Sequence, residues 1–155
     1  MSEAETPVDL QKYKVLLIED ERLIREIILR MLRNIGVTNV TEASSAEAGW
    51  EHLVGEKRRP FDVIMTDLTL PGMSGGALIK RLRALPSPAA KAMPVIVLTG
   101  STDLATYKRV AANNVSSYLV KPISADILRG AIAKAVVPAS PRPSPGRQAG
   151  AGQSK

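Results

Sequence analysis

The chain has 155 residues, which suits one domain and leaves little room for a second full-sized core. Hydrophobic residues make up 45% and charged residues 23%, ordinary values for a soluble globular protein. Because the chain has no cysteine, disulfide scaffolds, thiolate metal sites and cysteine nucleophiles are excluded. The single histidine, His52, excludes a polyhistidine metal site.

The formal charge of +6 raises the question of nucleic-acid binding. Residues 138–155 supply +3 of it and contain no acidic side chain, so residues 1–137 are only mildly basic. Aromatic residues, at 3%, are too few for a surface that stacks on single-stranded nucleic acid. The acidic N-terminus does not resemble a secretory signal, and no apolar run approaches the roughly 18 residues of a membrane span. We therefore expect a cytoplasmic location, no membrane insertion and no specific nucleic-acid partner.

The chain divides into three zones. Residues 1–13 are polar and are predicted to form a flexible lead-in. Residues 14–137 are dense in aliphatic side chains and are predicted to form the folded domain. Residues 138–155 are basic and rich in proline, glycine and serine, with too few apolar side chains to offset the entropy lost on ordering. We predict that this tail is disordered.

Within the folded zone, short β-branched apolar segments alternate with segments of helical periodicity. In chain order the pattern predicts a strand at 15–18, a helix at 23–35, a strand at 39–43, a helix from 45, a strand at 61–65, a helix at 75–85, a strand at 94–98, a helix at 102–112, a strand at 116–120 and a helix at 124–137. Five strand–helix units predict a doubly wound parallel α/β sheet with helices on both faces. The strands at 39–43 and 116–120 are the least apolar, which favours the sheet edges for them.

Polar side chains follow four of these strands. Glu19 and Asp20 follow the first strand, and Asp67 follows the third. Thr99 follows the fourth, and Lys121 the fifth. In an open parallel sheet these ends form the edge where ligands bind, so three carboxylates, a hydroxyl and an ammonium group should meet there. Three carboxylates repel one another, and a divalent cation together with the lysine would neutralise them. Oxygen ligands favour Mg²⁺, which shares its coordination sphere with phosphate, so the sequence outlines a phosphoryl-transfer site.

Four motifs in this order give the chain a resemblance to a known family. They are Leu17-Ile18-Glu19-Asp20-Glu21, the segment 63–75 (VIMTDLTLPGMSG), Val97-Leu98-Thr99-Gly100 and Tyr118-Leu119-Val120-Lys121-Pro122. Together they resemble the receiver domain of response regulators in two-component signalling. The resemblance implies a flavodoxin-like three-layer sandwich with strand order 2-1-3-4-5 over residues 14–137.

The resemblance also implies roles at the metal and phosphoryl site. Asp67 would accept a phosphoryl group from a phosphohistidine on a sensor histidine kinase or a histidine phosphotransfer protein. Glu19, Asp20, Asp67 and the backbone carbonyl of Thr69 would surround Mg²⁺. The Glu-Asp pair replaces the more common Asp-Asp pair and keeps both charges.

Further implied roles concern the response to phosphorylation. Thr99 and Lys121 would hold phosphoryl oxygens, and Tyr118 would turn inward when Thr99 moves. The family's output face, made of its fourth helix, fifth strand and fifth helix, corresponds here to Tyr107, Lys108, Arg109, Tyr118 and Arg129. Phosphorylation would favour one of two existing conformations, which a downstream protein binds better. Beyond self-phosphorylation and autodephosphorylation, no enzymatic activity is expected.

Each of these residues also has a simpler interpretation. The acidic run at 19–21 could be a solvated helix start, and Asp67 could only cap the turn that follows it. Thr99 could be a strand end, and Tyr118 ordinary edge packing. Thr69 and Ser101 occupy the positions that tune dephosphorylation in the family, and neither is an acid or an amide. The sequence therefore leaves the lifetime of the phosphoryl group open.

Other functions stay open at this stage. Only about 18 residues follow the folded zone, so we expect no output domain in the same chain. A phosphorelay intermediate would use the same residues, and the chain could be a receiver fragment of a larger DNA-binding regulator. A flavin- or nucleotide-binding redox protein could share the architecture, although the acids at 19–21 would repel a phosphate. The basic tail could give weak, salt-sensitive attachment to nucleic acid.

Overall fold

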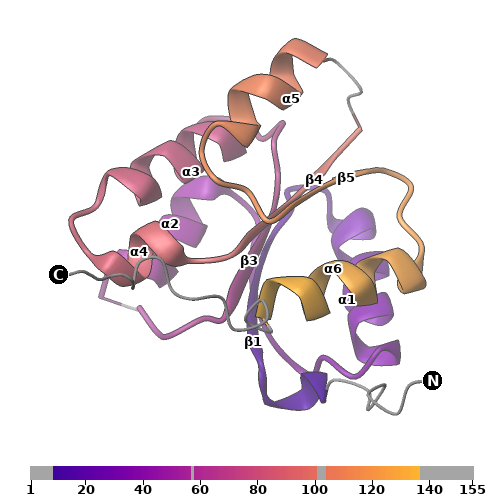
Figure 1. Cartoon of the computed structure of the whole chain (residues 1–155). Coiled ribbons are helices and arrows are strands. Elements are labelled where there is room, and N and C mark those ends of the chain that lie inside the picture. The colour runs from indigo at the N-terminus through magenta and orange to yellow at the C-terminus, as the bar shows by residue number, and fades with distance from the viewer. Residues whose placement is uncertain (1–8, 57, 101–103, 137–155) are drawn as a thin grey trace, which may run out of the picture.

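The computed structural model describes residues 9–56, 58–100 and 104–136 (Figure 1). The predicted tail, most of the lead-in and Ser101 lie outside these ranges. The elements are η1 (Leu10–Lys12, a 3₁₀ helix), β1 (Lys14–Ile18), α1 (Arg22–Asn34), β2 (Asn39–Ala43), α2 (Ala46–Val54), β3 (Val63–Asp67), α3 (Gly75–Ala84), α4 (Pro88–Ala92), β4 (Val95–Thr99), α5 (Leu104–Ala111), β5 (Ser117–Val120) and α6 (Ala125–Val136). No helix in the described ranges is long and apolar enough to cross a bilayer.

The five strands form one parallel sheet in the order β2-β1-β3-β4-β5. The fold class and strand order predicted above are therefore confirmed. All five residues of β3 and of β4 are buried, as expected for strands covered on both faces. The two weaker strands, β2 and β5, lie at the edges and are more exposed.

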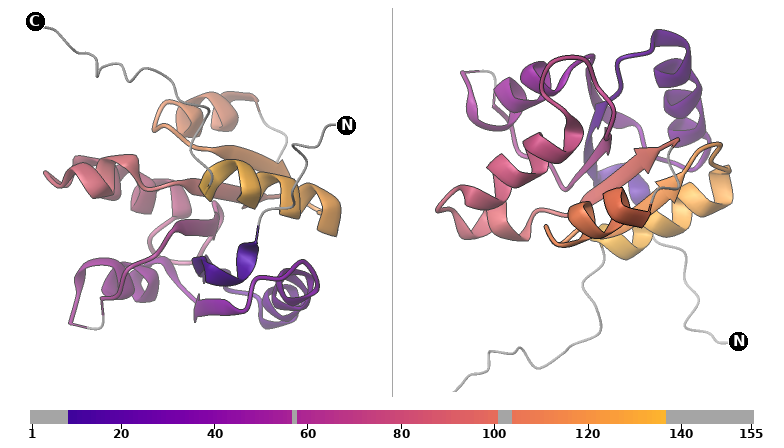
Figure 2. Two further views of the ribbon diagram at one scale, coloured as in Figure 1. Left: turned by 60° about the horizontal axis from the view of Figure 1, so that its bottom comes forward. Right: turned by 90° about the horizontal axis from the view of Figure 1, so that it is seen from above.

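Alternation along β1 divides the core between the two faces of the sheet. Val15 and Leu17 point to the face covered by α1 and α6, whereas Leu16 and Ile18 point to the face covered by α2 and α3. The views in Figure 2 and Figure 1 show these helix pairs on opposite sides of the sheet. The result is a three-layer sandwich that holds the carboxyl ends of the strands at one edge.

Serine side chains begin four of the helices. The hydroxyl oxygens of Ser45, Ser74 and Ser87 accept hydrogen bonds from backbone N–H groups three residues later, at the starts of α2, α3 and α4. Ser124, expected from the sequence to cap the last helix, accepts from the N–H of Ile127 at 3.2 Å. These caps satisfy N–H groups that have no partner inside the helix, and so they fix where each helix starts.

Two features differ from the sequence-based expectation. The end of the lead-in is not loose, because η1 places Leu10 in the core at 3% exposure, and the side chain of Asp9 accepts from the N–H of Gln11. The helix α4 was not predicted, since five residues are too few to show a helical period. It begins with Ser87 as its cap and Pro88 at its first position, where a missing N–H costs nothing.

Arg83, near the end of α3, connects α3 to α4 and to the turn after α5. Its guanidinium donates hydrogen bonds to the backbone carbonyls of Ala90 at 2.8 Å, Asn113 at 2.9 Å and Asn114 at 2.9 Å. Burial lowers the pKa of Arg83 from its ordinary value. Because the acceptors are main-chain atoms, the contact links the backbone segments of α4 and of the turn after α5 to α3, and it does not depend on the rotamers of the acceptor residues.

The Arg83 contact predicts a loss of stability on truncation. Arg83→Ala should lower the free energy of unfolding by about 2 kcal/mol, because three backbone carbonyls, two of them in part-buried hydrogen bonds, lose a charged donor. Urea unfolding measures the change. The matched control is Arg81→Ala, two positions away, whose guanidinium stacks over the Trp50 ring at 4.6 Å and should contribute under about 1 kcal/mol. Equal losses in both variants would contradict the role given to Arg83.

Candidate functional site

An open cleft lies at the carboxyl edge of the sheet. It has a volume of about 600 Å³ and is lined by Asp20, Glu21, Asp67, Thr69, Leu70, Pro71, Gly100 and Lys121. These residues lie at or just after the carboxyl ends of four different strands, β1, β3, β4 and β5, and Asp67 is itself the last residue of β3. The parallel order of the sheet therefore brings together the side chains predicted to meet there.

Lys121 joins two buried carboxylates. Its Nζ donates to Glu19 Oε1 at 2.9 Å and to Asp67 Oδ2 at 2.8 Å. Glu19 is 1% exposed and Asp67 7% exposed, whereas the Lys121 side chain is 18% exposed at the wall of the cleft. Oxygens of Glu19, Asp20 and Asp67 lie within 4.8 Å of one another. The three carboxylates predicted to meet at this edge and Lys121 thus form one cluster.

Backbone groups hold Glu19 in its position. Its Oε2 accepts from the N–H of Glu21 at 3.2 Å, so both carboxylate oxygens have donors. Its own N–H donates to the carbonyl of Ala43 at 3.1 Å. Its carbonyl accepts from Arg25 Nη1 at 2.8 Å, and Arg25 also pairs with Glu42 at 3.1 Å. Arg25 was missed by sequence reasoning, because nothing local marks a contact made through the main chain of Glu19.

Asp67 is fixed from two sides. Its Oδ1 accepts from the N–H of Thr69 at 3.0 Å, and its Oδ2 accepts from Lys121. The simpler interpretation of Asp67 as a turn residue is therefore also correct, and it coexists with the ion pair. The side chain of Glu21, in contrast, makes no capping hydrogen bond at the start of α1.

Gly75, the first residue of α3, lies against the backbone of Asp67. A Cβ added at Gly75 would lie 2.0 Å from the carbonyl oxygen of Asp67 and 3.0 Å from Leu68 Cα. The N–H of Gly75 also donates to the carbonyl of Leu68 at 3.0 Å. Close approach of two backbones, and not a phosphate loop, explains this glycine.

Burial and the ion pairs shift two pKa values in the cluster. Burial raises the pKa of Glu19, although the hydrogen bond from Lys121 opposes it. Burial alone would lower the pKa of Lys121, but hydrogen bonds to Asp67 and Glu19 outweigh it and hold that pKa above its ordinary value. The cluster thus favours a charged Lys121, but one ammonium group does not neutralise the three carboxylates around it.

The donor set fits Mg²⁺. Asp20 and Asp67 line the open cleft, whereas Glu19 lies beneath it and already accepts two hydrogen bonds. Three carboxylates and one ammonium group leave two negative charges, which a divalent cation would neutralise. Hard oxygen donors with an open side toward solvent are the kind of site in which Mg²⁺ keeps water and phosphate ligands. The carbonyl of Thr69 as a further ligand stays a prediction.

The residues of the predicted switch and output face lie on β4, β5, α5 and α6. Thr99 is 1% exposed at the end of β4, and its carbonyl accepts from the N–H of Lys121 at 2.7 Å. Tyr118 is half-buried on β5, and its ring meets that of Tyr107 edge-on, with centroids 4.9 Å apart. Lys108 and Arg109 are exposed on α5. Exposed Arg129, on α6, pairs with Asp126 at 3.4 Å.

Comparison with known proteins identifies the family. The family model of the response regulator receiver domain matches residues 15–133, so the chain belongs to this family. The chain is 32% identical to chemotaxis protein CheY of Pseudomonas aeruginosa over 121 residues, 78% of this chain and 94% of that protein. It is 31% identical to chemotaxis protein CheY1 of Helicobacter pylori, over 75% of this chain and 90% of that protein.

Solved structures show the same fold. A response regulator receiver domain protein from Clostridium thermocellum matches with a TM-score of 0.70 and 31% identity, covering 80% of this chain and 94% of that one. Vibrio cholerae chemotaxis protein CheY4 matches with a TM-score of 0.69 and 27% identity, covering 81% and 98%. These matches support a response regulator and do not favour a redox or nucleotide-binding protein.

The contact at Gly75 predicts a local and severe effect of one methyl group. Gly75→Ala should lower the free energy of unfolding by about 2 kcal/mol, because the added Cβ pushes the start of α3 away from the backbone of Asp67 and Leu68. It should also weaken Mg²⁺ binding measured by calorimetry. Gly76→Ala is the control, since a Cβ there meets nothing nearer than Ser74 Oγ at 3.9 Å. Equal sensitivity at both positions would refute the close-approach explanation.

Removing Lys121 should destabilise the fold, because the buried carboxylates lose their counter-charge. Lys121→Met should lower the free energy of unfolding by about 3 kcal/mol at neutral pH without Mg²⁺, because Glu19 loses its counter-charge. A raised pKa means that the ionised form is disfavoured in the folded state, so the deficit should shrink as pH falls toward 4.5, the ordinary value for this group. Added Mg²⁺ should also reduce the loss of stability in this variant. Denaturation across pH, with the exposed Lys134→Met as control, measures this, and a deficit independent of pH and Mg²⁺ would contradict it.

Proposed function

We propose that this chain is a response regulator whose Asp67 accepts a phosphoryl group from a phosphohistidine partner. The proposal is carried by the two ion pairs that Lys121 makes across the cleft to Glu19 and Asp67. In the transfer, the bond between phosphorus and the partner's histidine nitrogen breaks, and a bond from an Asp67 carboxylate oxygen to phosphorus forms. The histidine leaves with the electron pair of the broken bond.

The protein contributes charge and position to this transfer. Lys121 is held beside Asp67, where its ammonium group can balance the negative charge of the incoming phosphoryl oxygens. The N–H of Thr69 orients the carboxylate through Oδ1. Asp20 and Asp67, with Glu19 beneath them, would hold Mg²⁺, which when bound neutralises charge on phosphoryl oxygens.

An apolar surface beside the cleft supports docking of the phosphohistidine partner at α1. Leu23 and Ile27 are 75% and 51% exposed on this helix. A hollow of about 340 Å³ is lined by Ile24, Ile27, Ile28, Met31, Lys121, Pro122 and Ile123. Because Lys121 belongs both to this hollow and to the phosphoryl site, a protein seated here would have Asp67 within reach. We propose the sensor kinase or histidine phosphotransfer protein as its occupant.

The response to phosphorylation is proposed to pass through β4 and β5. Thr99 and Lys121 are joined by a backbone hydrogen bond, and Tyr118 lies opposite Val97 in the same strand pair. A shift of Thr99 toward a phosphoryl group would therefore act on the strand that carries Tyr118. A downstream protein would bind the resulting conformation at α5, β5 and α6. We class the chain as a signalling protein and not as a metabolic enzyme, and its cytoplasmic location stays a prediction.

The proposal predicts that labelling depends on one carboxylate. With acetyl phosphate and Mg²⁺, the unaltered chain should gain one phosphoryl group by intact mass, and Asp67→Ala should gain none. Asp126→Ala, at a carboxylate 87% exposed on α6, is the control and should label normally. Full labelling of Asp67→Ala would overturn the proposal. Rapid return of the label to a histidine phosphotransfer protein would favour the phosphorelay alternative.

A further inference from the structure

The segment that joins β2 to α2, residues 42–47, contacts both loops that carry predicted Mg²⁺ ligands. One is the loop after β1, which contains Asp20, and the other is the loop after β3, which contains Thr69. No residue of the segment lines the cleft at the carboxyl edge. Its contacts can therefore act on a bound cation only through the two loops.

The loop after β1 is held by Arg25 and by the backbone of Ala43. The Ala43 carbonyl accepts from the N–H of Glu19 at 3.1 Å, and the Glu19 carbonyl accepts from Arg25 Nη1 at 2.8 Å. Arg25 Nε donates to Glu42 Oε1 at 3.1 Å, and the Arg25 side chain is 17% exposed. The Glu19 carbonyl belongs to the planar peptide unit that links Glu19 to Asp20. Arg25 therefore sets the direction in which the chain continues into Asp20.

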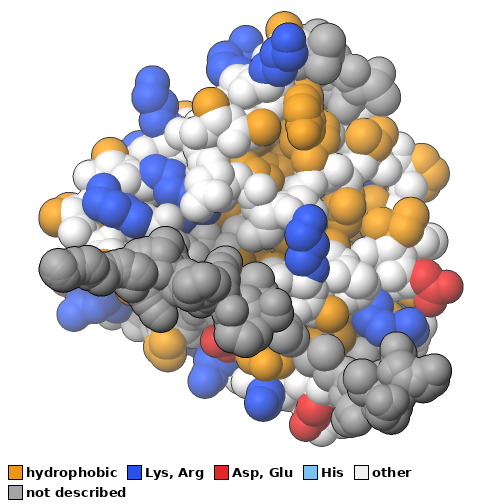
Figure 3. Space-filling model, in the orientation of Figure 1, with side chains coloured by type: hydrophobic (Ala, Val, Ile, Leu, Met, Phe, Trp, Pro, Cys, Tyr) orange, Lys and Arg blue, Asp and Glu red, His pale blue; other side chains and the backbone are white. Residues whose placement is uncertain are grey.

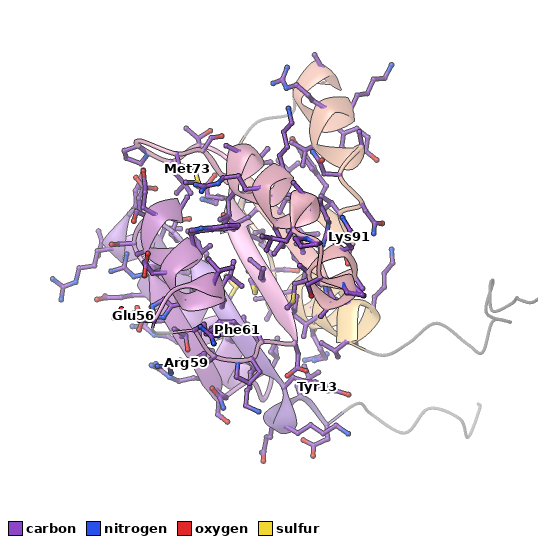
Figure 4. All side chains as sticks on the ribbon, turned by 90° about the vertical axis from the view of Figure 1, so that its left-hand side faces the viewer. Tyr13, Glu56, Arg59, Phe61, Met73 and Lys91 are labelled. Carbon is purple, nitrogen blue, oxygen red and sulfur yellow. The ribbon has the colours of Figure 1, made fainter. Side chains whose placement is uncertain are left out.

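The loop after β3 is held by Glu47. Its Oε2 accepts from the N–H of Met73 at 3.0 Å, and this hydrogen bond lowers the pKa of Glu47 from its ordinary value. Gly72 allows the approach, because its φ is +75° and a Cβ there would lie 2.6 Å from Glu47 Oε2. Figure 4 shows Met73 at the opposite end of the molecule from Tyr13, which precedes β1. Glu47 thus fixes the second half of the loop that contains Thr69.

The overall charge of the molecule does not favour a cation. The chain has a formal charge of +6, and on the face shown in Figure 3 basic side chains are more plentiful than acidic ones. Affinity for Mg²⁺ therefore depends on the oxygen atoms at the cleft and on how accurately they are placed. Removing groups that hold metal ligands in place commonly weakens metal binding by roughly 10- to 100-fold.

From these contacts we propose that Arg25 and Glu47 are positioning residues for Mg²⁺ at the carboxyl edge of the sheet. Arg25 acts through the Glu19 carbonyl on the loop after β1. Glu47 acts through the Met73 N–H on the loop after β3. The inference rests on the Mg²⁺ site of the proposed function, and it gives the segment 42–47 the task of holding both loops of that site.

Charge alone and positioning predict different effects for two substitutions. Arg25→Met removes a cation and leaves Glu42 unpaired, so charge alone would lower the Kd for Mg²⁺, whereas loss of the contact to Glu19 should raise it. Glu47→Gln removes an anion, so charge alone would raise the Kd. The amide oxygen of the new side chain can still accept from the Met73 N–H, so positioning predicts no change.

The test titrates the full chain with Mg²⁺ in a calorimeter, without a phosphoryl donor. Arg25→Met and Glu47→Ala should each raise the Kd about tenfold, and Glu47→Gln should keep the Kd of the unaltered chain. Two matched controls remove like charges from the same helices, at side chains that make no hydrogen bond to either loop within the described residues. They are Arg22→Met, 81% exposed on α1, and Glu51→Ala, exposed one turn along α2, and neither should raise the Kd.

Several outcomes would overturn the proposal. These are an unchanged or lower Kd in Arg25→Met, an equal rise in Glu47→Gln and Glu47→Ala, and an equal rise in the control variants. Urea unfolding accompanies each titration, and a loss of stability with an unchanged Kd would show that the contact is only structural. Glu47 is exposed, so its two variants decide the question even where Arg25→Met fails to fold.

Failure of this inference is separable from failure of phosphoryl acceptance, because calorimetry measures Mg²⁺ binding without any transfer. An unaltered chain that binds Mg²⁺ but gains no label from acetyl phosphate would refute the proposed acceptor and leave the positioning roles intact. An unaltered chain that does not bind Mg²⁺ would overturn the positioning roles, whatever the result of labelling.

Discussion

The ion pairs from Lys121 to Glu19 and Asp67 are the constraint on which the site depends. They join residues that are 102 and 54 positions apart, and they hold charges away from water. A buried pair of this kind is a weak source of stability, because desolvation offsets much of the attraction. Its consequence here is geometric: the ends of β1, β3 and β5 cannot drift apart without leaving a carboxylate unpaired. The charge that remains on the acidic side is then free to attract a cation.

The rest of the fold maintains this arrangement. Two layers of helices bury β3 and β4 completely and β1 from Val15 onward, so the strand ends form a rigid edge. Backbone contacts then refine the positions of single side chains. The N–H groups of Thr69 and Glu21 orient two carboxylates, and the missing side chain of Gly75 lets α3 approach Asp67. Function at this edge therefore relies on main-chain atoms as much as on the charged groups.

Much of the fold was predictable because its signals are local. Apolar β-branched runs marked β1, β3 and β4, and weaker runs marked the edge strands β2 and β5. The strand order, in contrast, came from the resemblance, since hydrophobic pattern alone does not determine which strands are neighbours. The convergence of Glu19, Asp67 and Lys121 followed from the rule that parallel strands end at the same edge. The arrangement by which Glu19 lies beneath the cleft and not in it had no sequence signal.

Other features escaped prediction for physical reasons. Helix α4 is shorter than two helical turns, so its hydrophobic pattern is too short to show a helical period. No sequence pattern marks Arg83, because its acceptors are main-chain carbonyls from distant segments. Contacts that a single residue makes with distant segments of the chain are thus the features that sequence patterns do not predict.

The position of η1 has a practical consequence for the handling of this protein. Leu10 anchors the chain beneath α1 and α6, just before β1 begins. The polypeptide thus enters the domain at the amino pole of the sheet, opposite the edge where the acids and Lys121 meet. A reporter or an immobilisation tag fused ahead of residue 9 would be attached at that far pole. The cleft at the carboxyl edge would then stay accessible to partners on a sensor surface.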